Sequence, residues 1–215
     1  MANRMGTDLT EGSIVKHLIN FSIPLLLGNV FQALYNTVDS IWVGQFLGAK
    51  ALGAVSVSFP IIFILISLVT GITMATSVLV AQYAGAKNPE MISKTMNNSF
   101  LLLGTVAVIV TTIGIVFNEQ ILILLNTPQE ILAFAVEYLN IYLLGLIFVF
   151  GFNVMSAVLN GLGDPRTPVK FLIVATITNI ILDPLFIFGV GFIPKMGIAG
   201  AALATIISQA LALAL

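Results

Sequence analysis

The sequence predicts an all-α integral membrane protein whose chain forms a bundle of six transmembrane helices. Composition is the first observation behind this prediction, because 59% of the 215 residues are hydrophobic and only 8% are charged. Charged residues make up roughly 25% of an average soluble domain. Segment length is the second observation, since the apolar residues gather in stretches of about the 20 residues that a span requires.

The six predicted spans follow a short polar segment at the N-terminus, residues 1–13. They lie at residues 14–43, 51–84, 95–117, 131–162, 168–190 and 197–215. The first is a retained helix and not a signal peptide, because its apolar run contains no small-residue cleavage site. The third is nearly uniformly apolar from Phe100 to Phe117, unlike the alternating strands of a β-barrel. The remaining spans are helices because each must satisfy its own backbone groups in hydrocarbon.

Basic residues are distributed unevenly between the two sides of these spans. Six of them lie near the N-terminus or beside the loops after even-numbered spans, and two lie in the other loops. The six are Arg4, Lys16, Lys87, Lys94, Arg166 and Lys170, and the two are Lys50 and Lys195. By the positive-inside rule, this distribution predicts a multi-pass protein of the plasma (inner) membrane with a cytoplasmic N-terminus.

The same composition excludes several functional classes. A net charge of -1 offers no basic surface for nucleic acid, and the absence of cysteine excludes disulfides and thiolate chemistry. The sequence contains neither a Gly-rich phosphate-binding loop ending in Gly-Lys nor an HExxH metalloprotease motif. We therefore predict that the chain is not an enzyme and binds no cofactor.

Two acidic residues lie inside apolar spans, where an ionisable side chain costs at least a few kcal/mol. In the first span, Asp39 ends a polar stripe whose spacings of three and four residues place it on one helix face. The stripe consists of Gln32, Tyr35, Asn36 and Asp39. In the fifth span, Asn179 and Asp183 share a face, and Pro184 leaves the carbonyl of Ile180 without its helical partner. These groups indicate a site for a cation or for water.

The two aspartates admit two interpretations. They can pair with polar neighbours and simply hold helices together, as polar side chains do in many membrane bundles. They can also carry a coupling ion, because a desolvated carboxyl near a second one takes up and releases a proton near neutral pH. The amide and tyrosine neighbours of both carboxyls favour the functional interpretation.

The fourth span carries a second polar stripe at helical spacing. It includes Tyr138, Tyr142, Gly145, Asn153, Ser156 and Asn160. Such a face lines either another helix or a binding cavity for amphipathic cations. Pro24 in the first span and Pro184 in the fifth are candidate hinges, because proline interrupts the helical hydrogen bonds.

Several ordered motifs resemble the multidrug and toxic compound extrusion (MATE) family. They are FSIPLLLGNVFQALYNTVDSIWVGQFLGAKALGAVSVSFP, MATSVLVAQYAGAKNPE, NGLGDPRTPVKF, NIILDPLFIFG and GIAGAALATIISQ. The resemblance extends over essentially the whole chain. The presence of both Asp39 and Asp183 resembles the DinF-like branch of that family.

The resemblance implies an antiporter that exports organic cations and other drugs by alternating access, driven by the entry of protons or sodium. Its fold would have two six-helix lobes, of which this chain corresponds to the N-terminal one. Carried over to matching positions, the coupling-ion site would consist of Asp39, Asn179, Asp183 and Thr205. The side chains that line the cavity, partly toward the substrate, would be Gln32, Tyr35, Asn36, Tyr138 and Asn153.

The family pattern of about twelve helices exceeds the six predicted here, so the chain resembles a truncated protein or an isolated half. Its expected partners are membrane lipid, cationic drugs, and the missing C-terminal six-helix lobe or a second copy. One alternative is a flippase-like carrier of lipid-linked intermediates, which would require several Arg or Lys inside the spans. Another alternative is a structural membrane module that binds neither drug nor coupling ion.

Overall fold

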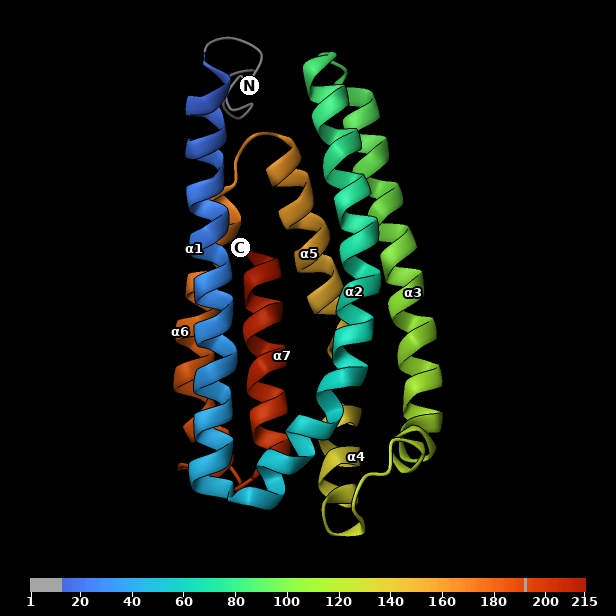
Figure 1. The fold of residues 1–215 in the computed structure, drawn as a ribbon, viewed down its shortest axis with the longest axis vertical. Coiled ribbons are helices and arrows are strands. Elements are labelled where there is room, and N and C mark those ends of the chain that lie inside the picture. Colours follow the sequence, from blue (N-terminus) through green and yellow to red (C-terminus); the bar gives the residue numbers. More distant parts are fainter. Residues whose placement is uncertain (1–12, 192) are drawn as a thin grey trace.

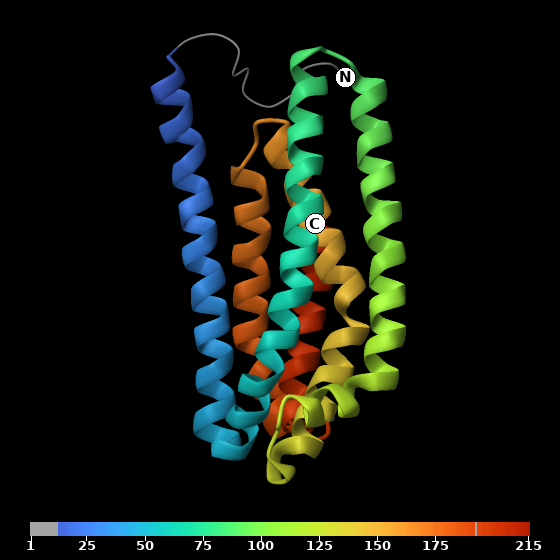
Figure 2. The ribbon, with the colours of Figure 1, turned by 45° about the vertical axis from the view of Figure 1, so that its right-hand side comes forward.

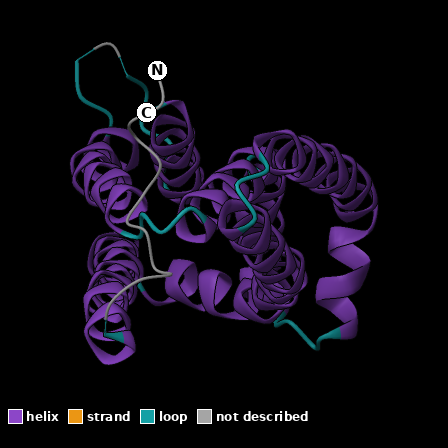
Figure 3. Cartoon of the chain, turned by 90° about the horizontal axis from the view of Figure 1, so that it is seen from above, coloured by secondary structure: helices purple, strands orange, loops and turns teal. Residues whose placement is uncertain are grey.

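The computed structural model describes residues 13–191 and 193–215, and these residues form long, mostly upright helices (Figures 1 and 2). The elements are α1 (Ile14–Trp42), the π-helical turn η1 (Val43–Leu47), α2 (Ala49–Gly85), α3 (Pro89–Leu124), α4 (Gln129–Leu144), α5 (Leu146–Gly161), α6 (Arg166–Phe188) and α7 (Ile198–Ala214). Except for Ser13, the predicted cytoplasmic segment 1–13 lies outside the described residues. The described residues contain no strand, in agreement with the predicted all-α class (Figure 3).

Length and apolar composition decide which helices can cross a membrane. Among the described residues, α1 together with η1, α2, α3 and α6 satisfy both criteria. The helices α4 and α5 satisfy them together as one bent span. The range predicted as the last span, 197–215, corresponds to α7, which is apolar but has only 17 residues.

The range predicted as the fourth span, 131–162, is divided into two helices. Gly145 lies at the break between α4 and α5, and the two helices are bent by 48° relative to each other. The apolar run continues through the break, and a single glycine inside a helix is tolerated at a cost of about 1 kcal/mol. Hydropathy therefore locates the span but not the bend within it.

Packing divides the bundle into two groups of helices. On one side α1 packs against α6, and α7 packs against α6, α5 and α4. On the other side α2 packs against α3, α4 and α5. Figure 1 shows α7 between the α1–α6 pair and the α2–α3 pair. The outer faces of the long helices carry exposed Leu, Ile and Phe side chains, as expected for helices that contact lipid.

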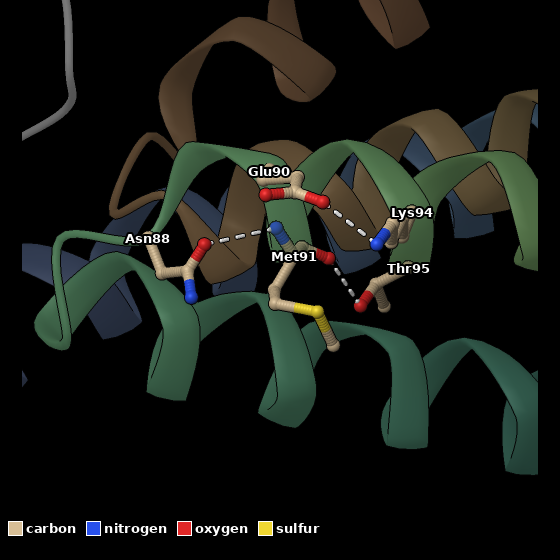
Figure 4. Close-up of polar contacts among 5 residues, drawn as sticks. All are labelled: Asn88, Glu90, Met91, Lys94 and Thr95. Atoms are coloured by element: carbon tan, nitrogen blue, oxygen red, sulfur yellow. Dashed lines mark hydrogen bonds and ion pairs between the residues drawn. The ribbon is translucent and has the colours of Figure 1, made fainter.

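The turn between α2 and α3 explains why α3 begins before the predicted span at residue 95. Asn88 Oδ1 accepts a hydrogen bond from the backbone N–H of Met91 at 3.1 Å, and Pro89 occupies the first helical position (Figure 4). Glu90 adds a carboxylate to the first turn and pairs with Lys94 at 2.7 Å. These are standard signals of a helix start, and they lie in a polar segment that a hydropathy criterion overlooks.

We expect Asn88→Ala to lower the free energy of unfolding by about 1 kcal/mol, because the N–H of Met91 loses its side-chain acceptor. Thermal unfolding in detergent and hydrogen exchange at the Met91 amide measure the effect. Asn97→Ala is the matched control, since Asn97 is exposed within the same helix, away from its start, and alanine favours a helix. Equal behaviour of the two variants would contradict the capping role of Asn88.

Candidate functional site

The two predicted aspartates lie inside the bundle, on helices that pack against each other. Asp39 on α1 is 7% exposed, and Asp183 on α6 is 0% exposed. The contacts between α1 and α6 place the two helices that carry these carboxyl groups side by side. The first and fifth predicted spans thus contribute one carboxyl each to a shared site.

On α6, the amide of Asn179 orients the carboxyl of Asp183. Asn179 Nδ2 donates a hydrogen bond to Asp183 Oδ1 at 3.1 Å, and both side chains are fully buried. The spacing of four residues makes this contact possible, because such side chains lie above one another on a helix. One turn earlier, Thr176 donates to the carbonyl of Leu172 on its own helix, which leaves the Asn179–Asp183 pair as the polar contact between side chains on α6.

Tyr35 connects α1 to α7. Its hydroxyl donates a hydrogen bond of 3.4 Å to the backbone carbonyl of Thr205, and both residues are buried. Thr205 therefore contacts Tyr35, which lies one turn before Asp39 on α1. Its place in the coupling-ion site stays a prediction. The contact recorded at Thr205 uses its carbonyl oxygen.

Two tyrosines of α4 complete the inner surface of the site. The rings of Tyr138 and Tyr142 are stacked with centroids 6.4 Å apart, and both residues are buried. Both lie on α4, which packs against α7, the helix that Tyr35 contacts. The sequence places Tyr142 with Tyr138 on the polar stripe of the fourth span, because their spacing of four gives them a shared helix face, although only Tyr138 was assigned to the cavity lining.

The other predicted site residues lie at various depths. In α1, Gln32 is half-buried and Asn36 is exposed, so the polar stripe crosses the boundary between the packed face and the outer face. In α5, Asn153 is half-buried, and its Nδ2 donates to the carbonyl of Val149 on its own helix. No recorded contact among the described residues joins Asn153 to the aspartates. The candidate hinge Pro24 is buried within α1.

Two further polar residues of α7 are buried in the bundle. Ser208 is 0% exposed and Gln209 is 7% exposed, and they follow Thr205 by three and four residues. That spacing is the signal that could have identified them. In the described part of the chain, several buried side-chain oxygens of α1, α6 and α7 have no hydrogen-bond partner from the protein. They include Asp39 Oδ1, Asn179 Oδ1, Asp183 Oδ2, Ser208 Oγ and Gln209 Oε1.

This arrangement determines what the site can do chemically. Carboxylate, amide and hydroxyl oxygens are ligands for hard cations, and a buried carboxyl also exchanges protons. Among the described residues, no group of three or more His, Cys, Asp or Glu side chains is arranged for a metal ion. The site thus offers two carboxyls and neutral oxygens in apolar surroundings, which suits a singly charged cation.

The fold and the site together define a class, a helical multi-pass membrane protein with a pair of carboxyl groups inside its bundle. Within this class the sequence matches the MatE family over residues 24–185, and the chain belongs to that family. The family match confirms the resemblance found in the motifs.

The relatives that this chain matches are longer than the chain itself. The chain is 39% identical over 205 residues to the probable multidrug resistance protein YpnP of Bacillus subtilis, a match that covers 95% of the chain and 45% of the relative. It is 31% identical over 215 residues to an FAD transporter of Shewanella oneidensis, a match that covers 100% of the chain and 47% of the relative. The chain thus spans about half the length of the curated relatives it matches.

Solved structures support the same fold. The chain matches the crystal structure of MATE in the bent conformation with a TM-score of 0.86 at 30% identity, covering 96% of this chain and 46% of that one. The straight conformation gives a TM-score of 0.85 with the same coverage. The chain is therefore an all-α membrane bundle of the MATE type, with its matches confined to under half of each solved chain.

We expect Tyr35→Phe to destabilise the protein by about 0.6 kcal/mol, a typical value for one hydrogen bond between membrane helices. The variant removes the donor to Thr205 and keeps the ring in place. Tyr83→Phe is the control, because Tyr83 is half-buried at the end of α2, away from the site. Thermal unfolding in detergent measures both variants, and an equal loss in both would refute a specific role for the contact between α1 and α7.

Proposed function

We propose that this chain forms the ion-coupling lobe of a multidrug efflux transporter that exchanges organic cations for protons or sodium. The observation that carries the proposal is the buried pair of Asp39 and Asp183 on the packed helices α1 and α6. Charged groups at membrane depth mark ion or substrate pathways far more often than they stabilise a bundle. The relatives named multidrug resistance or multidrug export proteins support drugs as the transported class.

The charge of the site supports cations over anions as its ligands. One similar protein is named an FAD transporter, and a flippase-like carrier would likewise move an anionic group. Anion binding within apolar surroundings requires cationic side chains. The Lys and Arg residues that the structure describes lie near helix ends or in turns, whereas the groups between α1 and α6 are carboxyls and an amide.

A purely structural role for the aspartates explains less. Polar residues that hold helices together satisfy each other's hydrogen bonds. Of the described atoms, Asp39 Oδ1 and Asp183 Oδ2 are buried with no partner from the protein. An unpaired buried oxygen costs about 1–3 kcal/mol, and a cation ligand would recover that cost.

The mechanism follows from competition for negative charge. When neither carboxyl holds a proton or another cation, two like charges lie in apolar surroundings. This doubly ionised state is costly, so the site attracts a proton or a sodium ion. Binding of one ion to the doubly ionised pair removes one of its two negative charges and weakens its attraction for an organic cation, which then leaves. The membrane potential adds about 2.3 kcal/mol per charge per 100 mV to ion entry.

Conformational coupling would act through α1 and through the rest of the transporter. The similar MATE protein was solved in bent and straight conformations, and Pro24 lies inside α1 as a candidate position for such a bend. A central cleft also needs a second lobe, which we assign to a C-terminal half or to a second copy of the chain. Because this chain spans under half of its relatives, we expect transport from the longer protein and not from the lobe alone.

We expect Asp39→Asn in the full-length protein to reduce drug efflux at least about tenfold, which corresponds to about 1.4 kcal/mol of lost coupling. The variant keeps the size of the side chain and removes its charge. Ethidium efflux from everted vesicles, measured against pH and against sodium, gives the effect. Glu137→Gln is the matched control because Glu137 is exposed on α4. Unchanged efflux and pH dependence in Asp39→Asn would refute the proposal.

We also expect ion binding to change the fluorescence of Trp42, the only tryptophan in this chain. Trp42 lies three residues after Asp39 and contacts Phe188 of α6 edge to face, with ring centroids 6.3 Å apart. Movement of α1 relative to α6 alters this contact. A titration with sodium chloride at fixed pH, with potassium chloride at equal ionic strength as control, separates sodium binding from a response to ionic strength. The response should disappear in Asp183→Asn.

A further inference from the structure

Thr111 makes a contact that differs from those of its neighbours on α3. Its Oγ1 donates a hydrogen bond of 2.7 Å to the backbone carbonyl of Leu143, which lies on α4. Thr105 and Thr112 on the same helix instead donate to carbonyls four residues earlier on α3. Such local bonds are the usual way a hydroxyl is satisfied in an apolar helix. The bond from Thr111 therefore has a tertiary role that the bonds of Thr105 and Thr112 do not have.

The accepting residue, Leu143, lies at the end of α4 beside the bend at Gly145. At the bend, the N–H of Gly145 bonds to the carbonyls of Ile141 and Tyr142 and also faces the carbonyl of Leu143. The carbonyl of Leu143 accepts the side chain of Thr111 at this point. Helix bends expose backbone acceptors that need another donor, and α3 supplies that donor here.

The side chain of Leu143 is held by the same part of α3. A Cβ on Gly114, which lies three residues after Thr111, would come within 2.7 Å of Leu143 Cδ1. A larger residue at this position would force the end of the Leu143 side chain to shift. Thr111 therefore contacts the backbone of Leu143, and Gly114 packs against its side chain.

The opposite side of the bend rests on α7. A Cβ on Gly145 would overlap the side chain of Ile206. Ile206 directly follows Thr205, whose carbonyl accepts the hydroxyl of Tyr35. The bend between α4 and α5 is thus clamped between α3 and α7, at the level of the candidate site.

The final turn of α4 carries Tyr142, one residue before Leu143, and Tyr138 lies one turn earlier. We propose that Thr111 is a positioning residue, whose bond to Leu143 fixes the bend and so holds Tyr138 and Tyr142 beside the Asp39–Asp183 pair. The inference about ligand binding rests on the proposed function, whereas the inference about the bend does not. Thr111 acts through α4, with no recorded contact to the carboxyls themselves.

The substitution Thr111→Val tests this role because valine keeps the shape of threonine and removes the donor. Thr111→Ser keeps the donor and is the conservative rescue. Thr112→Val removes a neighbouring hydroxyl that bonds within its own helix, so it is the matched control. All variants are made in the full-length protein in a cysteine-free background; this part of the chain has no cysteine of its own.

Two measurements separate the bend from the binding site. Spin labels at Ala133→Cys on α4 and Met155→Cys on α5 report the distance across the bend, since both residues are at least partly exposed. Ethidium binding, followed by fluorescence anisotropy, reports the affinity of the site. We expect Thr111→Val to shift or broaden the spin-label distance and to weaken ethidium binding roughly threefold to tenfold, the range of one hydrogen bond between membrane helices.

Thr111→Ser and Thr112→Val should both retain the wild-type distance and affinity. A wild-type distance in Thr111→Val, or an altered distance with unchanged ethidium affinity, would overturn the proposal. An equal effect in Thr112→Val would also overturn it, because that result would show general destabilisation of α3. If the unsubstituted protein binds no ethidium, the proposed function fails, and the spin-label distance still decides whether Thr111 holds the bend.

Discussion

The burial of two carboxyl groups between packed helices is the constraint on which the rest of the structure depends. Asp39 and Asp183 lie in a bundle whose described ion pairs, Lys50–Glu130 and Lys94–Glu90, are at exposed helix ends. No described lysine or arginine forms an ion pair with the two aspartates. Removing a carboxylate from water costs several kcal/mol unless charge and hydrogen bonds compensate. A cation that enters from outside the protein would provide the compensating positive charge. For this reason we assign the site to ion-coupled transport in our proposal.

Most neutral polar side chains bond within their own helix, so the few that bond to another helix determine how the helices lie relative to each other. Most hydroxyls in the described helices donate to the carbonyl four residues earlier, as Ser58, Thr70 and Thr105 do. These bonds satisfy the hydroxyl without joining two helices. Contacts such as Tyr35–Thr205 and Thr111–Leu143 do join helices, so they define how α1 and α4 lie relative to the site.

The sequence predicts those parts of the structure that depend on local pattern. Composition identifies the spans, and the spacing of Asn179 and Asp183 predicts the hydrogen bond between them, because both are properties of one helix. The bend at Gly145 escapes prediction because the apolar pattern is the same on both sides of it. The bond between Tyr35 and Thr205 joins residues 170 positions apart, and no local pattern contains that information. The roles of Asn36 and Asn153 remain predictions. Asn36 is exposed, and Asn153 bonds to a carbonyl of its own helix, and neither observation identifies a ligand.

The two helices that carry the aspartates are buried to different extents. Within this chain, 6% of the most apolar window of α1 is buried, against 33% for α6. A segment with few buried contacts moves at lower free-energy cost than a well-packed one. The weakly buried window of α1 lies before Tyr35 and Asp39, which are both buried, so α1 is free to move at its N-terminal part more readily than at the carboxyl pair. Trp42, three residues after Asp39, packs against Phe188 of α6, so the end of α1 that carries the carboxyl is the end held against α6.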